Sequence, residues 1–373
     1  MQNVVNTNEK KRSFLNYINV FRGLAILLIV MGHSMQIGAD KSLLHILWCE
    51  IVCGGTALFI FISGFLFQHL SGKFEYKNYL SKKWTNVIIP YIITAIPGLL
   101  FCFYMPSVYK NSFDGMNILA QIPVLLSIGR VHNTPAWFIP MIILFFLCSF
   151  LLLKLERKGI LYKLLPVLFL ITIFLQRGEI EYEQMLNLSY LERYLAYVKY
   201  IILGFIHFFS LYVFGMFCSK NKNIIDKFYE KRAPLWVLTL FFAGLDIYLS
   251  YKNIYSNYTV SKTFVTMLLL GYLKHYDGFI LSHNKTNKTL DFIAKYSFGI
   301  FFIHWYWIFI YNQITGLQGV IPVDNIETLP MVLITVFIRF LAVTGLSILT
   351  LWGLKNFILK INPKANTRMF LGV

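Results

Sequence analysis

Arg22 and His33 lie eleven positions apart within one apolar stretch of the sequence. In an α-helix, eleven residues make three turns plus about 20°, so both side chains lie on the same face. The helical rise separates them by about 16 Å. Because imidazole titrates near neutral pH, histidine is the usual general base toward a hydroxyl group. This face therefore carries a fixed cation at one end and a candidate base at the other.

Three further ionisable residues, Glu50, Asp246 and Arg339, also occur in apolar stretches. Glu50 begins the stretch that follows His33, at a similar depth. It could orient the imidazole and stabilise its protonated form, or it could be a solvated carboxylate at a helix end. Asp246 and Arg339 have opposite charges and are predicted to form a structural ion pair between two helices.

Two more histidines, His207 and His304, lie among aromatic residues. Both are predicted to be packed histidines, and His304 is the next candidate base after His33. The first pair has a structural interpretation too: Arg22 could extend toward lipid headgroups while His33 lies at the membrane interface. Spacing alone leaves these alternatives open.

The composition shows that charged residues are scarce in this chain. Of 373 residues, 57% are hydrophobic and only 14% are charged, whereas average chains have roughly 25% charged residues. This excludes a disordered chain and argues against a soluble one. A membrane-spanning helix needs about 20 mostly apolar residues. Ten segments are predicted to span a membrane: 14–35, 46–70, 85–104, 136–153, 161–175, 197–218, 234–251, 256–273, 293–314 and 330–354.

The details of these segments set further expectations. The fifth segment is short and the eighth begins with polar residues. The first apolar run is followed by no small-residue cleavage site, so it is expected to be a retained helix and not a signal peptide. The connection 105–135 contains the apolar stretch NILAQIPVLLSIG, which is predicted to lie on the membrane or to re-enter it.

The basic residues predict the orientation. The net charge is +17. If the N-terminus is cytoplasmic and the segments alternate, 24 of the 34 Lys and Arg residues lie in inner connections and 8 in outer ones, with Arg22 and Arg339 inside spans. This excess is the positive-inside distribution of membrane proteins. Dispersal of the basic residues over six inner segments also excludes nucleic acid as the partner.

The sequence therefore predicts an all-α, polytopic integral membrane protein of about ten transmembrane helices, with both termini cytoplasmic. Residues 1–373 are expected to form a single membrane-embedded domain, with polar cytoplasmic tails at 1–13 and 355–373. The five cysteines lie in apolar runs without the spacing of a disulfide framework or a metal site. No metal is expected.

Five motifs then carry a resemblance to a known family. The stretch RGLAILLIVMGH, from Arg22 to His33, resembles the opening signature of the acyltransferase-3 family of multi-spanning membrane O-acyltransferases. Four further motifs follow in the family's order: FIFISGF at 59–65, SKKWTNVIIPY at 81–91, AWFIP at 136–140 and SFGIFFIH at 297–304. The resemblance extends over most of the chain. In the third motif, Asn86 and Val87 stand where the family often has an arginine.

The resemblance implies transfer of an acyl group, usually acetyl, from cytoplasmic acyl-CoA to a hydroxyl of a cell-surface glycan or lipid-linked sugar in the cell membrane. Acyl-CoA is then a co-substrate, and no bound cofactor is implied. His33 is the expected catalytic base, and Arg22 is expected to contribute to catalysis and donor binding. Lys82 and Lys83 would join Arg22 in binding the donor phosphates. The expected acceptor-site or channel-lining residues are Glu50, Ser63, Trp137 and His304.

Each of these minor site residues also has a plainer interpretation. Ser63 and the following Gly64 are typical of close packing between membrane helices. Trp137 could stack on a sugar, line a channel or anchor a helix at the interface. Two other protein classes remain open: a transporter or flippase, which can also use intramembrane Arg and His, and a glycan polymerase or ligase of the cell envelope.

Overall fold

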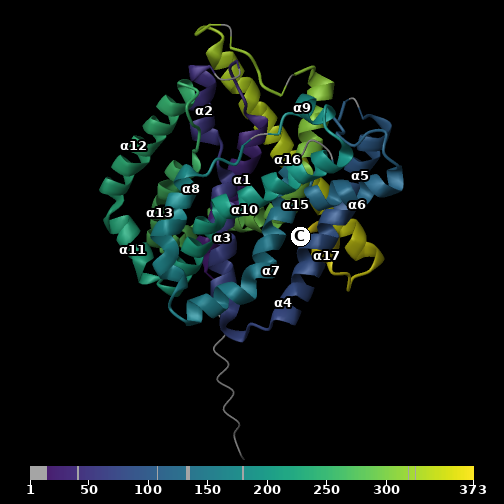
Figure 1. Cartoon of the computed structure of the whole chain (residues 1–373). Coiled ribbons are helices and arrows are strands. Elements are labelled where there is room, and N and C mark those ends of the chain that lie inside the picture. Colours follow the sequence, from purple (N-terminus) through teal and green to yellow (C-terminus); the bar gives the residue numbers. More distant parts are fainter. Residues whose placement is uncertain are drawn as a thin grey trace, which may run out of the picture.

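The computed structural model describes residues 15–39, 42–106, 108–131, 135–178, 180–317, 319–323 and 325–373. Within these ranges the protein is built of helices, and the one β-type contact is an isolated bridge between Ile37 and Ile321. The all-α prediction is confirmed (Figure 1). The predicted tail 1–13, with Lys10, Lys11 and Arg12, and the outer-loop residues Lys41 and Glu179 lie outside the described residues.

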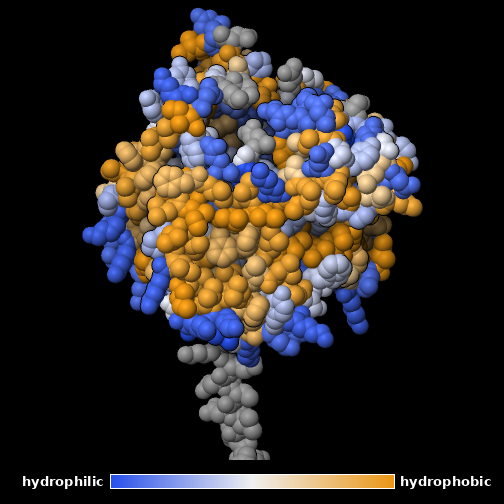
Figure 2. Space-filling model, in the orientation of Figure 1, coloured by the Kyte–Doolittle hydropathy of each residue, from blue (hydrophilic) through white to orange (hydrophobic). Residues whose placement is uncertain are grey.

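The surface and the helix lengths agree with a polytopic membrane protein. Figure 2 shows a broad hydrophobic belt between hydrophilic ends on the face in view. In the described part of the chain, eight helices or helix runs are long and apolar enough to cross a membrane: Asn16–Ser34, Leu43–Lys73, Tyr76–Tyr104, Phe138–Arg157, Tyr190–Lys220, Arg232–Tyr251, Asn284–Thr315 and Leu329–Ile361. The other two predicted segments are also helical but shorter, Leu161–Phe174 and α13 (Thr259–His275).

α1 (Asn16–Ser34) lies at the centre of the bundle. It packs against α3 (Gly55–Leu70), α13, α15 (Asn284–Thr315) and α16 (Leu329–Ile361). Its apolar residues are buried on several sides, which is why a helix this hydrophobic forms the core and not the lipid-facing layer. At the left of Figure 1, α12 (Arg232–Tyr251) forms an edge of the bundle, where most of its residues face outward.

Two glycines allow α3 and α10 (Tyr190–Lys220) to cross very closely. A Cβ atom at Gly64 would lie 1.9 Å from the main-chain oxygen of Tyr212, and one at Gly215 would lie 2.1 Å from the main-chain oxygen of Phe61. No other residue type fits at either position. The packing interpretation of the Ser63-Gly64 pair is therefore confirmed for Gly64.

The second predicted span, 46–70, is a broken helix. α2 (Leu43–Val52) is followed by Cys53 and Gly54, and α3 begins at Gly55. The φ of Gly54, 91°, is in the left-handed region that favours glycine. The sixth predicted span, 197–218, begins seven residues too late. α10 starts at Tyr190 because Ser189 and Glu192 form a capping box there.

The third span contains an irregular turn. α4 (Tyr76–Lys83) leads into the π-helical turn η2 (Trp84–Ile88), and α5 (Ile89–Tyr104) continues from it with Pro90 in its first turn. A proline is tolerated there because the first N–H groups of a helix have no intrahelical acceptor. The basic-then-proline motif thus coincides with a π turn, a feature frequent at functional sites.

Short helices occupy the connections. The stretch predicted to lie on or in the membrane forms α6 (Ile118–Ile128), which packs against α5 and α10. α9 is Tyr182–Leu186, α11 is Asn223–Glu230 and α14 is Asp277–Ser282.

The segment expected as a cytoplasmic tail is structured. Its first residues continue α16 to Ile361, and α17 (Thr367–Leu371) folds back against α5 and η2.

Candidate active site

A cavity of about 530 Å³ opens at the end of α1 that carries His33. Its wall is formed by the last turns of α1, the break between α2 and α3, and the turn before α7 (Phe138–Arg157). The segment after α8 (Leu165–Phe174), the N-terminal half of α10 and the start of α13 complete it. These helix ends lie opposite the N-terminus of α1. The charge distribution predicts that this end faces outward.

His33 lies in the wall of this cavity and is partly exposed. Its ring stacks on the ring of His304 at 5.6 Å between centroids and meets the ring of Trp305 edge-on at 5.5 Å. Among the residues that the structure describes, none forms a hydrogen bond with the His33 imidazole. The ring is thus held by packing, while its nitrogen atoms remain available to a substrate.

His304 lies behind His33 and is fully buried. Its Nδ1 pairs with the main-chain oxygen of Ile300 at 2.9 Å. Because a carbonyl oxygen only accepts, Nδ1 carries the proton and Nε2 keeps a lone pair. Nε2 has no hydrogen-bond partner within the described ranges. His304 is therefore packed, as one interpretation of the sequence predicted. The other prediction, that it lines the acceptor site or channel, is not met by this cavity, because His304 is not among its lining residues.

Arg22 lies toward the other end of α1, about 16 Å from His33 by the helical rise. Its Nη2 donates to Asn19 Oδ1 at 2.8 Å, and Asn19 in turn donates to Asp291 Oδ1 at 2.8 Å. The Nε atom of Arg22 is buried without a partner among the described residues. Arg22 is partly buried in the bundle. The interpretation that it simply extends toward the lipid headgroups is therefore not supported.

The two lysines of the third motif differ in environment. Lys83 lies over the rings of Tyr79, at 5.2 Å, and Phe146, at 4.6 Å, whereas Lys82 is exposed. Arg368 on α17 lies close enough to both Lys83 and Arg22 to repel their positive charges. These three cations therefore lie toward the N-terminal part of α1, the end that the charge distribution predicts to be cytoplasmic. Nothing in the sequence pointed to Arg368, because the contact depends on how the C-terminal segment folds back.

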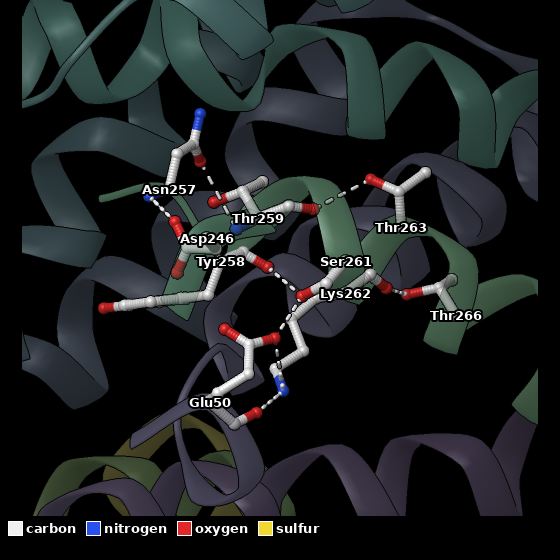
Figure 3. A network of polar contacts seen from close by, with 9 residues as sticks. All are labelled: Glu50, Asp246, Asn257, Tyr258, Thr259, Ser261, Lys262, Thr263 and Thr266. Atoms are coloured by element: carbon white, nitrogen blue, oxygen red, sulfur yellow. Dashed lines mark hydrogen bonds and ion pairs between the residues drawn. The ribbon is translucent and has the colours of Figure 1, made fainter. Parts of the chain in front are cut away.

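Glu50 belongs to a buried polar network with α12 and α13 (Figure 3). Its carboxylate accepts a hydrogen bond from Ser261, and Lys262 Nζ lies 3.8 Å from Glu50 Oε1 while donating to the main-chain oxygen of Glu50. Asp246 accepts from the main-chain N–H of Asn257. Glu50 is therefore not the solvated carboxylate considered from sequence, and its hydrogen bonds run to α13 and not to His33.

This network supports the cavity wall. The side chain of Lys262 packs on Gly54, where an added Cβ would lie 2.6 Å from Lys262 Cγ. Asn257, which Asp246 holds, lines the cavity itself. Lys262 lies inside the predicted span 256–273, and a lysine within a span is a sequence signal that a buried partner is needed.

The predicted ion pair between Asp246 and Arg339 is wrong. Arg339 is fully buried and donates to the main-chain oxygens of Ser34 and Gly319, the latter at 3.0 Å. The Asn312 side-chain oxygen also accepts from the guanidinium, at 3.4 Å. Asp246 instead accepts from Asn257 in the network of Glu50. The charges in the sequence could not predict these partners, because they do not show which main-chain oxygens lie near Arg339 in the folded chain.

The remaining predicted residues divide between the cavity and the packing. Trp137 lines the cavity, whereas Ser63 does not, because its hydroxyl donates to the Phe59 main-chain oxygen at 2.8 Å in its own helix. His207 also borders the cavity, but both ring nitrogens are occupied, by the Leu175 oxygen at 3.0 Å and by Thr259 Oγ1 at 2.9 Å. It is the hydrogen-bonded packed histidine that the sequence predicted.

Comparison with known proteins decides the family. The family model described as an acyltransferase domain matches residues 15–352, nearly the whole chain. The chain belongs to the acyltransferase-3 family. The comparisons with curated proteins and with solved structures found no match.

Membership of the acyltransferase-3 family makes this protein a membrane acyltransferase. The matched residues include all of α1 and therefore both Arg22 and His33. They end within α16, so Arg368 lies outside the match.

Proposed function

We propose that this acyltransferase-3 protein transfers an acyl group, acetyl in the first instance, from cytoplasmic acyl-CoA to a hydroxyl of a cell-surface glycan or lipid-linked sugar. One observation carries the proposal. His33 lies in the wall of the cavity at one end of α1, and Arg22 lies on the same helix toward the opposite end. A donor held at the inner end and an acceptor in the cavity would meet along this helix.

The donor end supplies cations for phosphate groups. Arg22, Lys83 and Arg368 gather there, and Arg22 has a buried Nε without a partner in the described part of the chain. Arginine and lysine are the usual ligands of phosphate, arginine through paired N–H donors. With the nucleotide of acyl-CoA held by these residues, the long pantetheine arm would extend along α1 toward His33. Positioning of this kind supplies a large share of the rate in bimolecular reactions.

The acceptor end supplies a base. His33 would take the proton of the acceptor hydroxyl while that oxygen attacks the thioester carbonyl carbon. The C–S bond then breaks, the acyl group remains on the acceptor oxygen as an ester, and the CoA thiolate leaves and recovers the proton. The stacked ring of His304 and the edge-on ring of Trp305 would fix the orientation of the His33 ring during this transfer.

The test is acyl transfer by the purified protein in liposomes, with radiolabelled acetyl-CoA and a panel of methyl glycosides. We expect labelled ester product from the wild type and a loss of about 10²–10⁴-fold in rate for His33→Ala. His283→Ala, at an exposed histidine far along the chain, is the matched control and should retain activity. A folded His33→Ala variant with near-full activity would refute the proposed base. Absence of both transfer and acetyl-CoA hydrolysis in the wild type would favour a transporter or a glycan polymerase.

An acyl-histidine intermediate is the competing scheme, in which His33 attacks the thioester before the acceptor arrives. Incubation with labelled acetyl-CoA in the absence of acceptor separates the two. Direct transfer leaves the protein unlabelled. Label that is stable in the wild type and absent from His33→Ala would show the two-step route.

A further inference from the structure

Arg177 is a cation among the aromatic residues of the cavity wall. It follows α8 in an extended segment, and its Cζ atom lies 3.9 Å from the ring centroid of Trp137, 4.9 Å from that of Tyr200 and 5.5 Å from that of Phe208. It also donates a hydrogen bond to the Tyr200 hydroxyl. All four residues line the cavity that contains His33.

The face of α10 fixes this arrangement. Tyr200, Gly204 and Phe208 recur at intervals of four residues, so they lie along one side of the helix. The stem of Arg177 packs over Gly204 between the two rings, where an added Cβ would be in ordinary van der Waals contact with Arg177 Cδ, at 3.7 Å. Trp137, from the turn before α7, stacks against the guanidinium. A residue in a segment without helical structure is thereby held in one place.

The charge of Arg177 is not neutralised within the described ranges. No carboxylate there lies within ion-pair distance of it, and its Nε is buried without a hydrogen-bond partner. The described lining of the cavity includes no Asp or Glu, although it includes neutral polar residues such as Gln176 and Asn257. A partly buried cation without a counter-ion is costly to maintain. Such a site is suited to an anion that arrives with a ligand.

We propose that Arg177 binds an anionic group, a carboxylate or a phosphate, on the acceptor saccharide and so places a hydroxyl of that saccharide at His33. This inference rests on the proposed function and narrows it to acidic or phosphorylated acceptors. A guanidinium pairs with either group through two parallel N–H donors. The aromatic wall around it also suits the face of a sugar ring.

The position of Arg177 assigns the anion to the acceptor and not to the donor. The cations suited to acyl-CoA phosphates, Arg22 and Lys83, lie toward the other end of α1. Arg177 shares the cavity with His33, so a ligand bound to it lies on the acceptor side of the proposed base.

The experiment compares three acceptors that differ in charge: methyl glucuronide, methyl glucoside 6-phosphate and neutral methyl glucoside. For the wild type, kcat/KM should be about 10- to 100-fold higher for an anionic acceptor than for the neutral one, the size expected of a hydrogen bond to a charged group. In Arg177→Gln this preference should disappear, mainly through a raised KM for the anionic acceptor. The better of the two anions identifies the group as carboxylate or phosphate.

Lys199→Gln is the matched control, because it removes a positive charge from an exposed position one residue from Tyr200 and outside the cavity. It should keep the preference. Arg177→Lys should keep part of it. The preference in the wild type should also weaken as salt is raised, whereas Arg177→Gln should show no such dependence.

Two results would overturn the inference. One is a wild type without preference for an anionic acceptor; the other is an Arg177→Gln variant that slows all three acceptors equally, which would mean structural support only. Calorimetric binding of whichever anionic glycoside the wild type prefers decides the question without turnover, since this binding should be lost in Arg177→Gln and kept in Lys199→Gln. The proposed function is tested separately by acetyl-CoA hydrolysis that depends on His33. If this hydrolysis is observed together with either of these two results, only the role of Arg177 is refuted.

Discussion

At the scale of the residue, the central feature is a histidine that is packed on one side and open to a cavity on the other. His33 has no hydrogen-bond partner among the described residues, while His304 behind it is bonded to the chain. Orientation by ring stacking leaves both His33 nitrogens for substrates. The proposed base is thus held by packing, whereas a functional histidine is often oriented by a hydrogen bond to a main-chain carbonyl or a carboxylate.

Arg22→Ala is predicted to weaken acyl-CoA binding by about 10- to 100-fold, because the proposed phosphate site would lose a cation that donates hydrogen bonds. Calorimetry with a non-hydrolysable acyl-CoA analogue measures this. Lys285→Ala, an exposed basic residue at the start of α15, is the control and should bind normally. Unchanged donor affinity in a correctly inserted Arg22→Ala protein would favour a structural role through Asn19 and Asp291.

At the scale of the element, the break between α2 and α3 and the crossing of α3 with α10 position the cavity. Gly54 allows the chain to turn, and Lys262 and Glu50 hold the turn in place. A continuous helix through this region would bring side chains into the space now lined by Cys53 and Gly55. Small residues therefore create the site as much as the ionisable ones do.

Gly64→Ala is predicted to lower the thermal stability of the purified protein. The new methyl group would lie 1.9 Å from the Tyr212 oxygen, which the helices can relieve only by moving apart. Gly345→Ala, in α16, meets nothing within 4 Å and should stabilise slightly, by about 0.5–1 kcal/mol, because alanine favours the helix. Thermal unfolding in detergent measures both, and equal effects would refute the close crossing.

Lys262→Met is predicted to destabilise the protein by about 3–5 kcal/mol, because it leaves the buried Glu50 carboxylate without its cation. Combining it with Glu50→Gln should restore part of the loss. A double-mutant cycle by denaturation measures the coupling. Strictly additive effects of the two substitutions would mean that the pair is not energetically linked.

At the scale of the whole molecule, the protein is one helical bundle with a hydrophobic belt. Its two ends are chemically different. One holds the cavity with His33 and Arg177, and the other gathers Arg22, Lys83 and Arg368. This polarity fits the proposed reaction, in which the donor and the acceptor approach from opposite sides of a membrane.

Reporter fusions inserted beside Lys220 and after Val373 are both predicted to be cytoplasmic. The reason is the excess of basic residues in the predicted inner connections. A protease-protection assay on intact cells provides the independent check. An external reporter after Val373 would mean an odd number of spans and would reverse the depths assigned to Arg22 and His33.

The sequence by itself determined that the protein is a helical membrane protein and that Arg22 and His33 lie toward opposite ends of one helix, α1. Hydropathy predicts where helices form because an apolar segment in lipid must satisfy its backbone internally. Each of the ten predicted segments is indeed largely helical. The spacing of Arg22 and His33 on one helix is likewise a local property, fixed by helical geometry before any packing occurs.

The tertiary structure alone decided what each ionisable side chain contacts. Glu50 pairs with Lys262 across 212 positions of sequence, Arg339 takes main-chain oxygens instead of Asp246, and Arg177 comes to lie against Trp137. Such contacts depend on which helices become neighbours and on acceptors in the main chain. Hydropathy and residue spacing predict the position and faces of a single helix, but they do not predict which helices become neighbours. The cavity and the position of Arg177 in its wall could therefore be found only in the folded molecule.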